Sequence, residues 1–147
     1  MKMNLSLMGI LLGLTLSSPV LYAETHDKPA AEAKADDKLK GYTDVSDALY
    51  KDNLEDAKKQ AADAAKDVKD EKIAKHYQGI AESKSLDEAR KHFKEVSDLL
   101  IPIAKKEGKM HEMHCPHAKA NWLQKSADEV QNPYEGKKMP HCGKEVK

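Results

Sequence analysis

Nearly all residues that could bind a soft metal ion lie in one segment near the end of this 147-residue chain. The 33 residues from 110 to 142 contain every cysteine and methionine that follows position 23, and four of the seven histidines. The nine candidate ligands are Met110, His111, Met113, His114, Cys115, His117, Met139, His141 and Cys142. Thiolate, thioether and imidazole together suit copper, and thioether selects against hard ions. The segment, about residues 109–147, is therefore predicted to bind a copper ion, with Cu(I) favoured and Cu(II) or Zn(II) as alternatives.

The two cysteines admit two interpretations. Cys115 and Cys142 are 27 positions apart, and a disulfide between them would persist in an exported protein. In the chain-entropy model such a bridge stabilises the fold by about 3 kcal/mol. As thiolates, the same residues would approach each other and bind metal, with Met139 and His117 or His141 completing a site of three or four donors.

A second capture site is expected beside the first. Met110, His111, Met113 and His114 are neighbours in a polar stretch. Either methionine taken alone is more often a packing residue than a ligand, but the adjacent histidines and Cys115 favour metal binding. The histidines outside the segment are interpreted differently: His76 and His92 as ordinary surface or boundary residues, and His26 as no more than a weak metal contact.

Other chemistries fit this sequence poorly. The chain has no C-x-x-C pair and no C-x-x-C-H haem signature, and no catalytic triad or phosphate-binding loop stands out. The basic and acidic residues balance at 25 each, and Arg90 is the single arginine. Because no basic patch results, nucleic acid is not expected as a partner. The protein is predicted not to be an enzyme.

The first 23 residues have the features of a secretory signal peptide. Lys2 precedes an apolar run from Leu5 to Leu16 that is too short to span a bilayer, and Ala23 occupies the expected cleavage position. Residues 24–41 then read as a flexible leader. The mature protein is expected in the periplasm, exported and soluble, with no membrane insertion after cleavage.

The residues that must position the metal segment have a helical pattern. Leu86, Ala89, Phe93, Val96, Leu100 and Ile103 follow an a/d spacing. Ser85 and Gly108 are the expected caps of this helix, and Asn53 caps another that starts at Leu54. Shorter helices are predicted around 45–49 and 73–81. The fold class is therefore predicted as all-α: an antiparallel bundle of about four helices over residues 42–147, with an irregular C-terminal segment packed on it.

The C-terminal segment is expected to be loops plus one short helix around residues 118–130. Trp122 and Leu123 are the residues expected to dock it on the bundle, and no strand of useful length is predicted. Only 17 of the 124 residues after position 23 are Leu, Ile, Val or Phe. A domain with so few large apolar residues is usually stabilised further by a cross-link or a metal ion.

The segment also resembles a known family. The residues that carry the resemblance are Cys115-Pro116-x-Ala118, Trp122-Leu123 and Asn132-Pro133-Tyr134-x-Gly136-x-x-Met139-x-x-Cys142-Gly143. They are similar to a poorly characterised bacterial periplasmic helical domain family, which also occurs fused to membrane-fusion subunits of copper and silver efflux systems. The resemblance covers roughly residues 42–146. It implies a helical domain associated with heavy-metal handling, with Cys115, Met139 and Cys142 at the motif positions. The family commonly has methionine directly after Cys-Pro, where this chain has His117.

These observations predict a periplasmic copper-binding protein that sequesters the ion or hands it to an efflux component. The alternative is a disulfide-stabilised envelope interaction module without a metal role.

Overall fold

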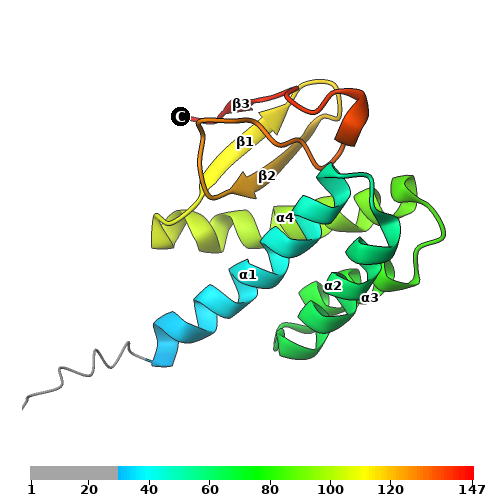
Figure 1. Cartoon of the computed structure of the whole chain (residues 1–147). Coiled ribbons are helices and arrows are strands. Elements are labelled where there is room, and N and C mark those ends of the chain that lie inside the picture. The colour runs from blue at the N-terminus through cyan, green and yellow to red at the C-terminus, as the bar shows by residue number, and fades with distance from the viewer. Residues whose placement is uncertain (1–29) are drawn as a thin grey trace, which may run out of the picture.

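The computed structural model describes residues 30–147, with side chains at Leu39 and from Gly41 onward. Its elements are α1 (Ala30–Tyr50), α2 (Leu54–Asp67), α3 (Glu71–Glu82), α4 (Leu86–Glu107), β1 (His111–Cys115), β2 (Ala120–Gln124), the 3₁₀ turn η1 (Gly136–Lys138) and β3 (Lys144–Glu145). In Figure 1 the sheet lies on top of α4, while α2 and α3 lie on its lower side. The predicted signal peptide, residues 1–23, lies outside the described residues.

The four predicted helices are present in the described part of the chain, and each packs against the next. Their ends are set by the residues that the sequence indicates. Asn53 accepts a hydrogen bond from the backbone N–H of Asp56, and Ser85 accepts one from that of Glu88. Gly108 ends α4 in the left-handed conformation at φ 66°, which glycine adopts without strain. The predicted helical bundle is therefore present, with short connections between its helices.

Helix α1 is longer than the sequence predicts. It begins at Ala30, so residues 30–41 of the expected flexible leader are helical. Alanine and lysine, which are frequent there, have high helix propensity. The buried side chain of Leu39 packs this part of α1 against the core.

The expectation of a wholly helical fold is wrong, because a three-stranded antiparallel sheet in the order β2-β1-β3 follows α4. Cys115 pairs with Ala120 at the turn between β1 and β2, and Met113 pairs with Trp122 in the middle of both strands. The helix predicted around 118–130 is also wrong, since β2 occupies residues 120–124. These strands are short and are held by pairing and burial rather than by local propensity.

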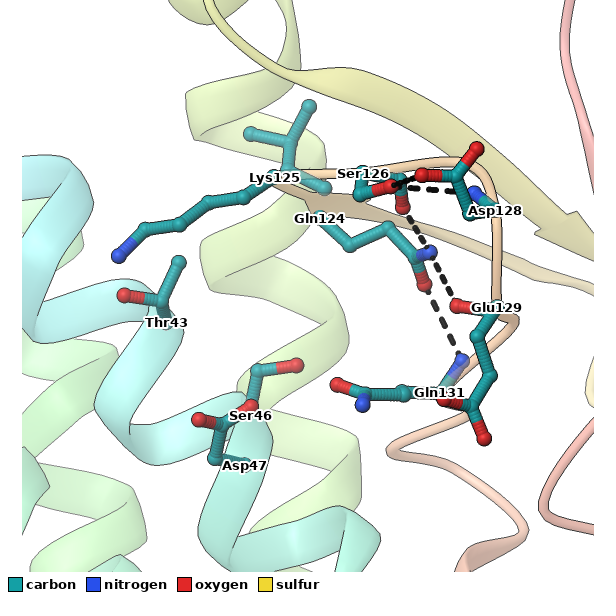
Figure 2. A pocket seen from close by; sticks show the side chains of 10 residues that line it. Thr43, Ser46, Asp47, Gln124, Lys125, Ser126, Asp128, Glu129 and Gln131 are labelled. Carbon is teal, nitrogen blue, oxygen red and sulfur yellow. Dashed lines mark hydrogen bonds between the residues drawn. The ribbon is translucent and has the colours of Figure 1, made fainter.

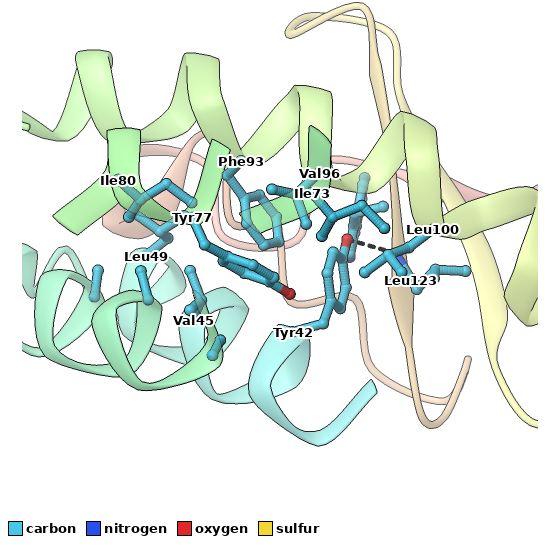
Figure 3. Close-up of a cluster of buried hydrophobic side chains, with 14 of the residues drawn as sticks. Tyr42, Val45, Leu49, Ile73, Tyr77, Ile80, Phe93, Val96, Leu100 and Leu123 are labelled. Carbon is cyan, nitrogen blue, oxygen red and sulfur yellow. Dashed lines mark hydrogen bonds between the residues drawn. The ribbon is translucent and has the colours of Figure 1, made fainter. Parts of the chain in front are cut away.

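One hydrophobic core joins the sheet to the bundle. Trp122 and Leu123 are fully buried, so their predicted docking role is confirmed. The ring of Tyr42 stacks on that of Phe93 at 4.9 Å between centroids, in the cluster that Figure 3 shows. Its hydroxyl accepts a hydrogen bond from the backbone N–H of Leu123 at 3.1 Å and shares another with Ser97 at 2.7 Å. The buried phenol therefore fixes β2 on the helices.

No helix among residues 30–147 combines the length and the apolar character needed to cross a membrane.

Candidate metal centre

The structure brings the two cysteines together. Cys115 ends β1 and is fully buried, whereas Cys142 lies in the turn after η1 and is half-buried. Their Sγ atoms are 3.3 Å apart, and both cysteines are free. The fold therefore places these two thiols in contact although they are 27 residues apart in sequence.

The distance between the two sulfur atoms lies between the values expected for a disulfide and for two thiolates bound to one metal ion. A disulfide would require about 2.05 Å. Two thiolates bound to one tetrahedral ion, each about 2.3 Å from it, would be about 3.8 Å apart. At 3.3 Å, a small approach would give the disulfide and a small separation would admit an ion. The geometry is compatible with both interpretations of the cysteines.

The backbone of the β1–β2 turn lies beside both sulfurs. Ala118 donates its N–H to Cys115 Sγ at 3.3 Å, and a backbone hydrogen bond from His117 lowers the pKa of Cys142. The net pKa of the Cys142 thiol is nevertheless raised above its ordinary value, first by the hydrogen bond with Cys115 and then by burial. The Cys142 thiol therefore retains its proton at neutral pH, and a metal ion would have to displace it.

Asn132 holds the segment that carries Cys142. This fully buried side chain donates Nδ2–H to the carbonyl of Cys142 at 2.5 Å. Its Oδ1 accepts hydrogen bonds from the backbone N–H groups of Tyr134 and Glu135. Its own N–H bonds the carbonyl of Pro140. One amide side chain thus closes the loop that returns Cys142 to Cys115.

Arg90 fastens the same loop to the helices. Its guanidinium donates to the carbonyls of Pro133 (2.9 Å) and Leu49 (3.1 Å) and to Asp52 Oδ1 (2.5 Å). Asp52 also accepts the backbone N–H of Lys137. A Cβ at Gly136 would lie 1.9 Å from Asp52 Oδ1, so only glycine fits there.

The four histidines of the segment share one hydrogen-bonding arrangement. Each ring uses Nδ1 to reach an oxygen: His111 to Glu145 (2.6 Å), His114 to Asn121 (2.6 Å), His117 to Glu135 (2.7 Å) and His141 to the carbonyl of Val130 (2.8 Å). These oxygens accept, so Nδ1 carries the proton and Nε2 of a neutral ring keeps its lone pair. Metal-binding histidines are oriented in this way.

The structure does not assemble all nine predicted ligands into one or two clusters. Met113 is 1% exposed and packs in the core, and Met110 packs against the same core. Because side chains alternate along a strand, His114 faces the opposite side of β1 from His111 and Met113. The predicted capture site is therefore split, with Met113 buried. Within residues 41–147, no group of three or more His, Cys, Asp or Glu side chains is arranged to hold a metal ion.

Sequence reasoning missed Asp52 and the positioning roles of Asn132 and Arg90. Two features of the sequence point to Arg90 and Asn132. Arg90 is the only arginine in the chain, and Asn132 begins the Asn-Pro-Tyr-x-Gly motif. Tyr134 of this motif donates its hydroxyl to the carbonyl of Asn121 at 2.7 Å, which ties the loop to β2.

A polar hollow of about 370 Å³ lies between α1 and the loop that follows β2, as Figure 2 shows. Thr43, Ser46 and Asp47 line it from α1, and burial raises the pKa of Asp47 above its ordinary value. Gln124 braces the facing loop by accepting the N–H of Gln131. None of the nine predicted ligands lines this hollow, so it is separate from the thiol pair.

Comparison with known proteins gives one match. A family model described as "Protein of unknown function (DUF3347)" matches residues 39–112, half of the chain. The match covers the helices from the end of α1 onward and the first residues of β1, and it stops before Cys115. No curated protein and no solved structure matches the chain.

Proposed function

We propose that this chain, which belongs to the family of proteins of unknown function DUF3347, binds copper as Cu(I) through Cys115 and Cys142. Its role is to sequester the ion in the periplasm or to hand it to an efflux component. The observation that carries the proposal is the 3.3 Å separation of two free thiols that are 27 residues apart in sequence. Two thiolates form a soft site, which favours Cu(I) over hard ions.

Further ligands are available beside the thiols. Met139 is in the same turn as Cys142, whose N–H bonds the carbonyl of Met139 at 3.1 Å. His117 follows Cys115 in the β1–β2 turn, is 58% exposed, and is oriented by the 11% exposed carboxylate of Glu135. Either residue would complete a three-coordinate Cu(I) site, and an imidazole ligand would also accept Cu(II) or Zn(II).

Export and a link to efflux are proposed from the sequence. The features of a signal peptide in residues 1–23 support a periplasmic location, and the Cys-Pro and Asn-Pro-Tyr motifs resemble domains fused to copper and silver efflux subunits. The soft donors of the segment suit such a role because efflux systems of this kind handle soft ions.

Competition for Cu(I) against a chromophoric chelator, under reducing anaerobic conditions, tests the proposal. The full chain should bind one Cu(I). Cys142→Ser should weaken binding at least about 100-fold, because loss of a hydrogen bond that merely supports a metal ligand already costs about 10–100-fold. Met110→Leu is the matched control, since Met110 is a soft residue that packs on the core, and it should bind like the parent chain. Unchanged affinity in Cys142→Ser would refute the thiol site.

The affinity for Cu(I) should rise with pH. The raised pKa of Cys142 means that metal binding displaces at least one proton. Between pH 6 and 8 the binding constant should therefore increase by about one log unit per pH unit for each proton released. Chelator competition at several pH values, corrected for the chelator's own protonation, measures this slope. A slope of zero would contradict binding by the thiol pair.

The alternative function is a disulfide-stabilised interaction module. It is favoured by the same short distance, because oxidation of the pair needs only a small approach of the sulfurs. Alkylation of the thiols in the isolated protein, with and without copper, distinguishes this module from the copper site.

A further inference from the structure

Two histidines outside the C-terminal segment meet between α3 and α4. The ring centroids of His76 and His92 are 5.9 Å apart, with the planes inclined at 47°. Both side chains are half-buried. Their positions in sequence, in the middle of two helices, indicated only ordinary boundary residues, so the pairing is a product of helix packing.

The backbone of α3 makes room for this pair at Gly79. A Cβ at that position would lie 2.6 Å from the ring atoms of His92. Glycine in a helix interior is unfavourable relative to alanine. The sequence thus carries a helix-weakening residue at the point where the His92 ring lies against α3, one turn from His76.

The ring nitrogens are not committed to other partners. Among the described side chains, the interaction of His76 and His92 is their ring contact, and neither ring forms a hydrogen bond or an ion pair. This contrasts with the four histidines of the C-terminal segment, whose Nδ1 atoms are all hydrogen-bonded. The two nitrogen atoms of His92 lie against Gly79, and a neutral imidazole whose unprotonated nitrogen makes no hydrogen bond can bind a metal ion through that atom.

The distance between the rings fits a bound ion. A metal–nitrogen bond of about 2.0–2.1 Å places the ion about 3.2 Å from each ring centre. Two rings on one ion then have centres about 4.5–6.4 Å apart, for angles at the ion from about 90° to 180°. The observed 5.9 Å lies within this range. Glu95, three residues after His92 on α4, is exposed, whereas Glu88, four residues before it, accepts the backbone N–H of Lys84 at the start of the helix.

We propose that His76 and His92 form a second metal site, a two-histidine chelate for a borderline divalent cation such as Cu(II), Ni(II) or Zn(II). The site lies on the helical bundle and contains no thiol, so it does not require Cys115 or Cys142. Imidazole suits these ions, and the Irving–Williams order makes Cu(II) the tightest and Ni(II) weaker.

Titration of the reduced full chain with Ni(II), followed by NMR, tests this site. Paramagnetic Ni(II) should broaden the amide signals around residues 76 and 92 with a single saturable affinity. His76→Gln and His92→Gln should each weaken this binding at least tenfold, because one imidazole alone cannot chelate. His141→Gln is the matched control, since His141 is an exposed histidine of the other segment, and it should leave the affinity at this site within twofold of the parent.

A third variant keeps both histidines and displaces one. Gly79→Ala should push the His92 ring aside while favouring the helix, so it should also weaken Ni(II) binding at least tenfold in a folded protein. Circular dichroism checks that each variant is folded. The proposal is overturned if the parent chain shows no broadening around residues 76 and 92. Unchanged Ni(II) affinity in His92→Gln would overturn it equally.

Discussion

Replacing Arg90 with methionine is expected to lower the free energy of unfolding by about 2–3 kcal/mol, somewhat less than the loss of about 3–5 kcal/mol when one partner of a fully buried ion pair is removed, because this pair is partly buried. The guanidinium is 14% exposed and its partner Asp52 is 26% exposed. Its loss would leave the Asp52 carboxylate without its cation and the Pro133 carbonyl without this donor, while the Leu49 carbonyl would keep only the backbone N–H of Asp52. Because native domains are stable by only about 5–15 kcal/mol, this is a large fraction of the total.

Urea denaturation, monitored by circular dichroism and by Trp122 fluorescence, measures the change. Lys91→Met is the matched control: Lys91 is the next residue on α4 and is exposed, so its replacement should change stability by no more than about 0.5 kcal/mol. Arg90→Lys should recover only part of the loss, since a lysine cannot reproduce the planar set of donors. The two Arg90 variants should also make Cys142 react faster with alkylating reagents, Arg90→Met more than Arg90→Lys, because the loop from Asn132 to Cys142 loses its anchor. If Arg90→Met lowered the free energy of unfolding by less than about 1 kcal/mol, the anchoring role of Arg90 would be contradicted.

Oxidation of Cys115 and Cys142 to a disulfide is expected to raise the free energy of unfolding by about 3 kcal/mol in the chain-entropy model. The two thiols would lose two electrons and two protons to an added oxidant such as oxidised glutathione. The sulfurs are already 3.3 Å apart, so the bridge should form without rearrangement of β1. Its main effect should be to restrict the unfolded chain between residues 115 and 142.

Denaturation of the oxidised and reduced chain, with Cys142→Ser as the control that cannot form the bridge, checks this value. The same preparations separate the two functions. A protein isolated with a complete, metal-independent bridge supports the interaction module. Two titratable thiols that copper protects from alkylation support the copper site. An oxidised protein no more stable than the reduced one would show that the bridge strains the fold.

The helical half of the structure follows from local sequence. The caps at Asn53, Ser85 and Gly108 act through hydrogen bonds and backbone conformation within a few residues, and the apolar spacing of α4 depends only on the period of a helix. The start of α1 was missed because its Ala- and Lys-rich composition is shared by flexible leaders and helices. The burial of Leu39 distinguishes them.

The sheet could not be derived in the same way. Its strands are five, five and two residues long, and the sequence from His111 to Cys115 contains few residues with strand preference. Met113 and Trp122 become strand residues because they pair across the β1–β2 turn and are buried on the helices. Pairing of this kind is a tertiary property, and tertiary context overrides weak propensity.

For the candidate sites, the sequence by itself determined which donors are present and that the soft ones are concentrated between Met110 and Cys142. Only the tertiary structure decided which of them meet. It places Cys115 beside Cys142, takes Met113 into the core, and brings His76 against His92 from separate helices. The physical reason is that residue type fixes what a side chain can bind. Which donors meet depends instead on strand alternation, on helix packing and on the Arg90 and Asn132 anchors, all of which join residues far apart in the chain.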